Sequence, residues 1–171
     1  HWKPLHYMID VYIWVMRGTP LLLQLIFIYY VLPSIGIRLD RVPAAIIAFT
    51  LNYAAYFAEI FRGGIATIPQ GQYEAAKVLK FKPIDTVRYI ILPQVTKIVL
   101  PSVFNEVMSL VKDTSLVYAL GISDLILASR TVANRDASLI PMFLAGAIYL
   151  LMIGIVTILA KKLEKKFSYY R

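Results

Sequence analysis

The alternation of apolar runs and polar breaks predicts a chain that crosses a membrane several times. Three long stretches carry no Asp, Glu, Lys or Arg: residues 18–37, 42–58 and 137–160. About 20 apolar residues cross the hydrocarbon core of a bilayer, with a working range of roughly 17 to 25. All three stretches meet this length, the second only narrowly, so each is expected to form a spanning helix.

A fourth apolar stretch, residues 98–111, is shorter and is interrupted by Asn105 and Glu106. It can span only if it faces a protein interior or a watery path, or if it continues through residues 112–121. With this segment included, the pattern predicts an all-α fold, a polytopic transmembrane helical bundle with four spans.

The segment before the first span is predicted as a separate helix, because apolar and aromatic residues recur at helical spacing over residues 7–15. Gly18 should end this helix, with Thr19 as the N-cap of the next one and Pro20 in its first turn. The chain lacks an initial Met and a signal-peptide cleavage pattern. We therefore expect a piece of a longer protein that starts in a cytoplasmic loop.

Residues 66–94 are polar and are predicted to form a hairpin of two short amphipathic helices. Thr67 and Gln70 fit a capping box for the first helix. Pro83 suits the first turn of the second helix, and Pro93 should end it, because a residue before proline is pushed out of helical geometry. The alternative is a solvated loop that lies on the membrane surface.

Composition and charge support the membrane interpretation. The chain is 59% hydrophobic and only 16% charged, with a mean hydropathy of +0.67, whereas a soluble domain carries roughly 25% charged residues. The net charge of +8 could indicate a nucleic-acid partner. However, 13 of the 18 Lys and Arg residues fall at the two chain ends, Arg17 and Arg171 included, or around the hairpin. This bias predicts that the hairpin and both ends are cytoplasmic, near anionic lipid, with no nucleic acid bound.

The hairpin carries a motif that resembles a known family. Glu74-Ala75-Ala76, followed by residues 90–93 (IILP), resembles the EAA motif of permease subunits in bacterial ATP-binding cassette (ABC) importers. Four further segments resemble the branch that imports polar amino acids: residues 17–21, 58–65, 71–76 and 112–116. They occur in the family's order, and the resemblance runs from Arg17 to about Glu164.

The resemblance implies a multi-pass subunit of the bacterial cytoplasmic membrane, with a cytoplasmic C-terminus and residues 1–171 as one permease domain. Its partners would be a dimer of ABC ATPase subunits, a second permease subunit, an extracytoplasmic solute-binding protein and an amino-acid substrate. Residues expected to couple to the ATPase are Tyr73, Glu74, Ala75, Ala76, Leu79, Lys80, Pro83 and Pro93. The small side chains of Ala75 and Ala76 would let a partner approach closely.

The chain itself is not expected to be an enzyme. It has no G-x-x-x-x-G-K-[ST] loop, so ATP and Mg²⁺ should bind to the partner ATPase. No catalytic residue, metal site or cofactor is expected, since the chain has no cysteine and only two histidines.

Two features depart from the family pattern. Lys80 stands where the family usually has glycine, and a left-handed backbone there would cost about 1–2 kcal/mol. Either the turn differs locally, or contacts with the ATPase absorb this strain. The family typically has five spans, and the first is expected to be missing here.

Polar residues near the fourth stretch are candidates for the translocation path: Asn105, Glu106, Lys112, Asp113, Thr114 and Ser115. Ionisable groups at membrane depth are often functional, and acids together with a lysine could meet both charges of an amino acid. The alternative is a Lys112 ion pair with Glu106 or Asp113 that locks helices together. For Gln24 and Asn52, interhelical hydrogen bonds are the expected role.

Two other classes of protein compete with the importer. A secondary transporter or channel would explain the spans and the acidic residues, but it would need neither the hairpin nor an ATPase. A membrane-embedded enzyme would need a nucleophile or a metal constellation that the sequence lacks.

Overall fold

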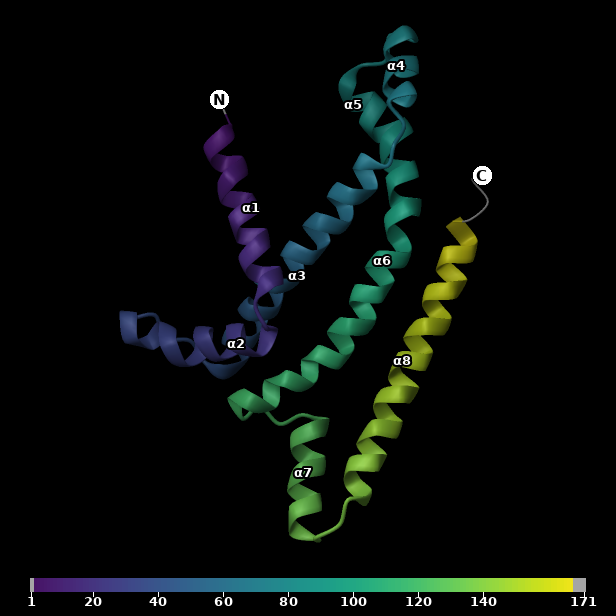
Figure 1. Ribbon diagram of the computed structural model, residues 1–171. Helices are drawn as coiled ribbons and strands as arrows, with labels where there is room; N and C mark the ends of the chain where they lie inside the picture. Colours follow the sequence, from purple (N-terminus) through teal and green to yellow (C-terminus); the bar gives the residue numbers. More distant parts are fainter. Residues whose placement is uncertain (1, 168–171) are drawn as a thin grey trace.

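The computed structural model describes residues 2–167, and every regular element in that range is helical (Figure 1). Arg171, one of the positive charges assigned above to the cytoplasmic side, lies outside the described residues. In chain order the elements are α1 (Lys3–Gly18), α2 (Leu21–Ile26), the π-helical η1 (Phe27–Val31), the 3₁₀ helix η2 (Leu32–Ile35), α3 (Arg41–Ala66), α4 (Gln70–Val78), α5 (Pro83–Asp85), the π-helical η3 (Thr86–Ile91), α6 (Leu92–Asp113), the 3₁₀ helix η4 (Thr114–Leu120), α7 (Leu125–Arg135) and α8 (Ile140–Phe167). The predicted all-α helical bundle is confirmed.

Three helical runs are long and apolar enough to cross a membrane: Arg41–Ala66, Pro83–Leu120 and Ile140–Phe167. They correspond to three of the four predicted spans, and the fourth apolar stretch does continue through η4. The remaining predicted span, over residues 18–37, is not found as a spanning helix of its own. That stretch forms α2, η1 and η2, which together lie at 106° to α1, so α1 and α2–η2 count as a span only if the bent pair is taken as one.

The bend has a local cause at the end of α1. Pro20 has an extended backbone (φ −62°, ψ 134°) and serves as the N-cap of α2, and proline also lacks the N–H that would continue a helix. Thr19 is therefore not the cap that the sequence suggested. Its hydroxyl donates instead to the carbonyl of Val15 at 2.8 Å, which closes the last turn of α1.

The helices leave the two described termini and the hairpin at one end of the molecule, and α2 and α7 at the other (Figure 1). Helix α3 packs against α1 and α6, and α6 packs against α8. One apolar cluster, built around Leu25, Ala48 and Leu120, joins α2, α3 and η4. The other consists of Ile68, Ile91, Val95 and Val99, and lies at the base of the hairpin.

Helices α3 and α6 pack closely at Gly64. A Cβ added there would lie 2.3 Å from Cγ1 of Val99, which is closer than real Cβ atoms come. Only a residue without a side chain permits this packing, so Gly64 sets the distance between the two helices.

The hairpin differs from its predicted form at both of its ends. Helix α4 starts after Pro69 with no side-chain cap, and the Thr67 hydroxyl donates to the carbonyl of Gly64 at 2.7 Å instead of forming a capping box. At the other end, Pro93 does not stop the second helix, which continues through η3 into α6. The π-helical turn η3 widens the helix immediately before Pro93, and this makes room for a ring that would clash in a regular α-helix.

The turn between α4 and α5 is left-handed at Lys80, which has φ 57°. Glycine adopts this backbone conformation at low cost, whereas lysine does not. The amide of Lys80 donates to the carbonyl of Lys77, and that of Phe81 to the carbonyl of Ala76, both at 3.0 Å. These two bonds form a Schellman motif, within which Lys80 bears a strain of about 1–2 kcal/mol.

Candidate functional site

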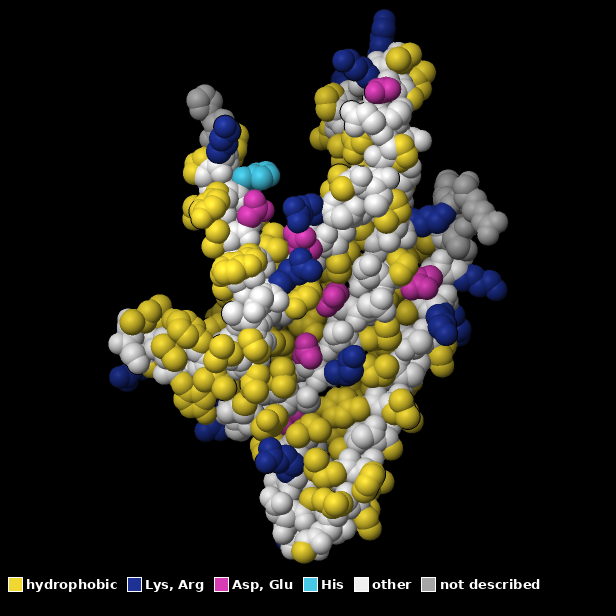
Figure 2. Space-filling model, viewed as in Figure 1, with side chains coloured by type: hydrophobic (Ala, Val, Ile, Leu, Met, Phe, Trp, Pro, Cys, Tyr) yellow, Lys and Arg dark blue, Asp and Glu magenta, His cyan; other side chains and the backbone are white. Residues whose placement is uncertain are grey.

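A cavity of about 630 Å³ lies between the end of α1, the middle of α3 and the second half of α6. Figure 2 shows acidic and basic side chains gathered in the hollow between these helices, whereas the outer faces are largely hydrophobic. The lining residues are Arg17, Gly18, Thr19, Pro20, Leu21, Leu22, Asn52, Tyr53, Tyr56, Glu106, Ser109, Lys112, Asp113 and Leu116.

Three of the six predicted path residues, Glu106, Lys112 and Asp113, line this cavity. Asn105 and Thr114 are exposed and, like Ser115, do not contribute to its wall. Other polar residues that line the cavity come from α1 and α3. They were not predicted from the sequence as part of a translocation path. Asn52 was assigned only a packing role, and nothing in the local sequence connects Arg17, Tyr53 or Tyr56 with the acids of α6.

The two carboxylates enter the cavity from one face of α6, because they are seven residues apart on a continuous helix. The Tyr53 hydroxyl donates to Oδ2 of Asp113 at 2.8 Å, from α3 across to α6. In the part of the chain that the structure describes, Lys112 forms no ion pair with Glu106 or Asp113. The predicted lock between Lys112 and an acid is therefore absent there, and Asp113 is held by a neutral phenol.

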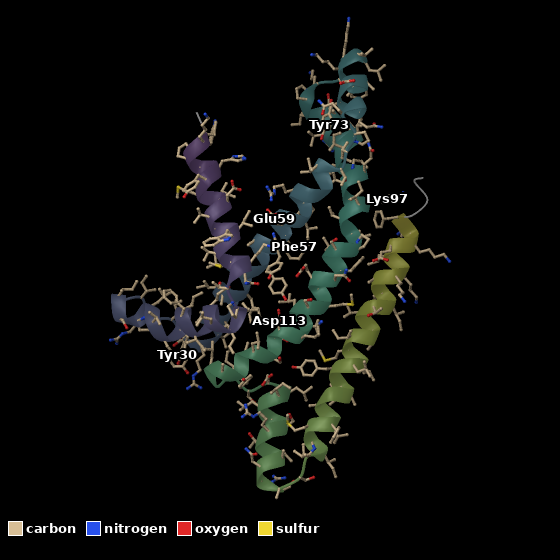
Figure 3. The ribbon with its side chains drawn as sticks, in the orientation of Figure 1. Tyr30, Phe57, Glu59, Tyr73, Lys97 and Asp113 are labelled. Atoms are coloured by element: carbon tan, nitrogen blue, oxygen red, sulfur yellow. The ribbon has the colours of Figure 1, made fainter. Side chains whose placement is uncertain are left out.

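Arg17 brings a cation to the opposite wall. Its Nη1 lies 3.3 Å from Oε2 of Glu59, and its guanidinium lies 5.4 Å from the centre of the Tyr56 ring. Glu59 also accepts a hydrogen bond from Nη2 of Arg62 at 2.7 Å. Glu59 on α3 and Asp113 on α6 both lie beside the space framed by the three helices (Figure 3). Arg17, which the charge count grouped with the N-terminal end, also lines the cavity.

Gln24 and Asn52 make the interhelical hydrogen bond expected of them. Nδ2 of Asn52 donates to Oε1 of Gln24 at 3.0 Å and to the carbonyl of Met16 at 3.0 Å. Nε2 of Gln24 donates to the same Met16 carbonyl at 2.9 Å and to Oγ1 of Thr19 at 2.8 Å. Carbonyls at a helix C-terminus need outside partners, so these two amides stabilise the sharp bend that forms one wall of the cavity.

The tip of the hairpin is a second candidate site. Val78, Leu79 and Ile84 are 80%, 69% and 73% exposed, and Lys80 lies between them. Exposed apolar side chains gathered on one protruding element typically mark a surface that another protein covers. The predicted coupling residues include Leu79 but not Val78 or Ile84.

The predicted coupling residues divide between the surface and the interior of the hairpin. Glu74 and Ala75 are exposed, as the resemblance requires of a docking surface. Ala76 is only 1% exposed, so it offers no room to a partner, and Tyr73 packs against the cluster at the base of the hairpin. Of the two alanines, therefore, only Ala75 lies at the surface.

Comparison with known proteins agrees with the helical arrangement. Residues 2–169 match the family of binding-protein-dependent transport system inner membrane components. The chain belongs to this family. It is 34% identical to the L-cystine transport system permease protein TcyB of Bacillus subtilis (strain 168), over 98% of this chain and 73% of the relative. It is 37% identical to the arginine transport system permease protein ArtQ of the same organism, over 96% of this chain and 76% of the relative.

A solved structure shares the fold as well. The chain superimposes with a TM-score of 0.88, at 34% identity, on a chain of the crystal structure of an amino acid ABC transporter with histidines, over 96% of this chain and 77% of that one. Membership of this family makes the chain a multi-pass permease subunit of an ABC importer. The prediction of such a permease is confirmed, and the alternative of a secondary transporter or channel is not supported.

Proposed function

We propose that this permease carries a polar amino acid through the cavity between α1, α3 and α6, driven by an ATPase that docks on the hairpin. The observation that carries the proposal is the pairing of opposite charges in one cavity, with Arg17 on one wall and Glu106 and Asp113 on the other. An amino acid bears a carboxylate and an ammonium group, and each needs a partner where water is scarce. The relatives named for L-cystine and arginine transport also handle α-amino acids.

In this proposal Arg17 receives the substrate carboxylate, because a guanidinium presents several donors in a fixed plane. Glu106 receives the ammonium group. Asp113 is already an acceptor for Tyr53, and its second oxygen leaves it able to take part. Glu59 competes for Arg17 until the substrate arrives, so binding would exchange one carboxylate partner of the arginine for another.

The hairpin is proposed as the docking element for the ATPase, with Glu74, Ala75, Leu79, Lys80 and Pro83 at the contact. Its exposed apolar tip supports this role, because a cluster of apolar side chains on a protein surface is more stable when a partner protein covers it than when it contacts water. The hairpin and both chain ends then lie in the cytoplasm, as the distribution of Lys and Arg indicates. ATP and Mg²⁺ bind to the partner, and a solute-binding protein and a second permease subunit complete the importer.

Substrate passage is tested by uptake of a panel of radiolabelled amino acids into vesicles that contain the complete complex. Glu106→Gln keeps the shape of the side chain and removes its charge, and Glu164→Gln near the end of α8 is a matched control outside the cavity. Loss of a charge-assisted hydrogen bond of about 1.5–3 kcal/mol should reduce uptake at least tenfold for the cavity variant only. Equal uptake by the two variants would show that the substrate does not use this cavity.

ATPase docking is tested separately by co-purification. Glu74→Lys reverses an exposed charge on α4, and Asp10→Lys makes the same change on the exposed face of α1, away from the hairpin. We expect the Glu74 variant alone to lose the ATPase or to uncouple ATP hydrolysis from uptake. If both variants retain the partner and the uptake, the hairpin is not the docking element.

A further inference from the structure

A second recess lies at the hairpin end of the molecule, between the start of α6 and the end of α8. It has a volume of about 930 Å³ and is separate from the charged cavity. Its wall is mainly apolar and aromatic, with Tyr89, Leu92, Ile98 and Phe167 among the lining residues. Figure 3 places Lys97 in the space between α6 and α8. We call this recess the α6–α8 groove.

Lys97 gives the groove a positive charge that no carboxylate within residues 2–167 balances in an ion pair. The side chain is half-buried and lines the groove, and none of the ion pairs within residues 2–167 includes it. A half-buried ammonium group without a carboxylate favours an anion from outside the chain. The last two turns of α8, which precede Phe167, carry further positive charges at Lys161, Lys162 and Lys166. The one acidic residue in these turns is Glu164.

The position of the groove indicates what kind of anion. Phe167 lines it at the lysine-rich end of α8, and its other wall is formed where α6 meets the polar hairpin. The end of a spanning helix that is rich in lysine is expected to lie level with the lipid headgroups. Tyr89 is typical of that interface, since its ring is apolar and its hydroxyl polar. An apolar wall beside a cation matches a molecule with a hydrocarbon part and a phosphate. Basic pockets between spanning helices on the cytoplasmic side are known to hold anionic headgroups.

We propose that the α6–α8 groove binds an anionic phospholipid, with its phosphate on Lys97 and its apolar part against Leu92, Ile98 and Phe167. The occupant is a lipid of the surrounding membrane and not the transported solute. The inference depends neither on what the charged cavity carries nor on whether the hairpin binds an ATPase. The lipid would lie against Pro93 and the last turn of η3, where the hairpin joins the long helix.

The test is a lipid titration of the purified full chain in detergent, followed by native mass spectrometry. Phosphatidylglycerol and phosphatidylcholine are used with the same acyl chains and differ in the net charge of the headgroup. The difference between their affinities therefore measures the contribution of the charge, and the affinity for phosphatidylcholine measures that of the apolar wall. We expect tighter binding of phosphatidylglycerol, and a fall of about fivefold in that affinity for Lys97→Gln, as expected for one lysine at a lipid surface. Lys97→Arg should keep the preference. Lys3→Gln, an exposed lysine at the same end of the molecule, should leave it unchanged.

A second variant tests the apolar part without touching the charge. Ile98 is partly exposed in the groove, so Ile98→Trp should fold, narrow the groove and weaken the binding of both lipids. This variant keeps the proposal testable if the Lys97 variants fail to fold.

The proposal is overturned if Lys97→Gln and Lys3→Gln reduce the affinity for phosphatidylglycerol by the same factor, because the lipid would then be attracted by the overall positive charge and not by the groove. It is also overturned if the wild-type chain binds both lipids equally. A groove covered by a second copy of the chain, or by another segment of a longer protein, would give no lipid binding and so would overturn it too. Because no transport is measured, loss of uptake in the Glu106 experiment leaves these outcomes unaffected.

Discussion

Replacing Gly64 by alanine tests the close approach of α3 and α6. The new Cβ would lie 2.3 Å from Cγ1 of Val99 and 3.4 Å from Cγ1 of Val95. Two carbon atoms in ordinary contact are about 3.5–4.0 Å apart, so the helices must separate by about 1 Å, or Val99 must move. Val99 is 4% exposed and β-branched, with one strongly preferred rotamer in a helix. It therefore cannot turn aside at low cost.

The neighbouring glycine supplies the control. A Cβ at Gly63 meets nothing within 4 Å, so Gly63→Ala should gain up to about 1 kcal/mol of helix propensity. Gly64→Ala gains the same propensity but adds overpacking of about 1–3 kcal/mol. We expect the Gly64 variant to be the less stable of the two by about 1–3 kcal/mol. The measurement is unfolding of the purified chain in detergent, followed by circular dichroism.

A second background separates the clash from any other effect of alanine at this position. In a Val99→Ala chain the obstructing methyl groups are absent, so adding Gly64→Ala should cost little or should stabilise. If Gly64→Ala is as stable as Gly63→Ala in the wild-type background, α3 and α6 do not pack as closely as described, and the reasoning is refuted.

Three further changes test single contacts. Tyr53→Phe removes the hydrogen bond to Asp113 and should lower the free energy of unfolding by about 1–3 kcal/mol. An equal cost in an Asp113→Ala background, which has no acceptor for the hydroxyl, would contradict the pairing. Lys80→Gly removes the backbone strain of a left-handed lysine. It should increase the free energy of local opening of α4, measured by amide hydrogen exchange, by up to about 1 kcal/mol. A decrease in this protection would argue that Lys80 is not strained. Glu59→Gln removes the ion-pair partner of Arg17 at the cavity. It should lower the KM for amino-acid uptake, because the Glu59 carboxylate then no longer competes with the substrate carboxylate for Arg17. A raised KM would show instead that Glu59 positions the arginine.

Features that depend on residues close together in the sequence were predictable. The lengths of the apolar stretches indicated two of the spans, over residues 42–58 and 137–160, and the shorter stretch 98–111 proved to span through its continuation into η4. The charged segment between them indicated the hairpin. The seven-residue spacing of Glu106 and Asp113 correctly placed both acids on one face, because helical periodicity determines which side chains lie together.

Features that depend on contacts between distant segments were not predictable in the same way. Residues 18–37 have the composition of a span, and their bend depends on amides of Gln24 and Asn52 that meet at Met16. Arg17 looks like an ordinary flanking cation until Glu59 of α3 is placed beside it. Pro93 usually signals a helix end, but here the widened turn η3 accommodates it.

The continuity of the helical run Pro83–Leu120 has a mechanical consequence. At about 1.5 Å per residue, Val99 is about 24 Å from Pro83 and about 21 Å from Asp113. The run therefore resembles a lever with two nearly equal arms and its fulcrum where Val99 meets Gly64. For a rigid run, a tilt of about 10° swings both ends by about 4 Å in opposite directions. If an ATPase docks on the hairpin as proposed and Pro101 does not bend the run, a push on the hairpin would move the Asp113 carboxylate by a similar distance in the opposite direction.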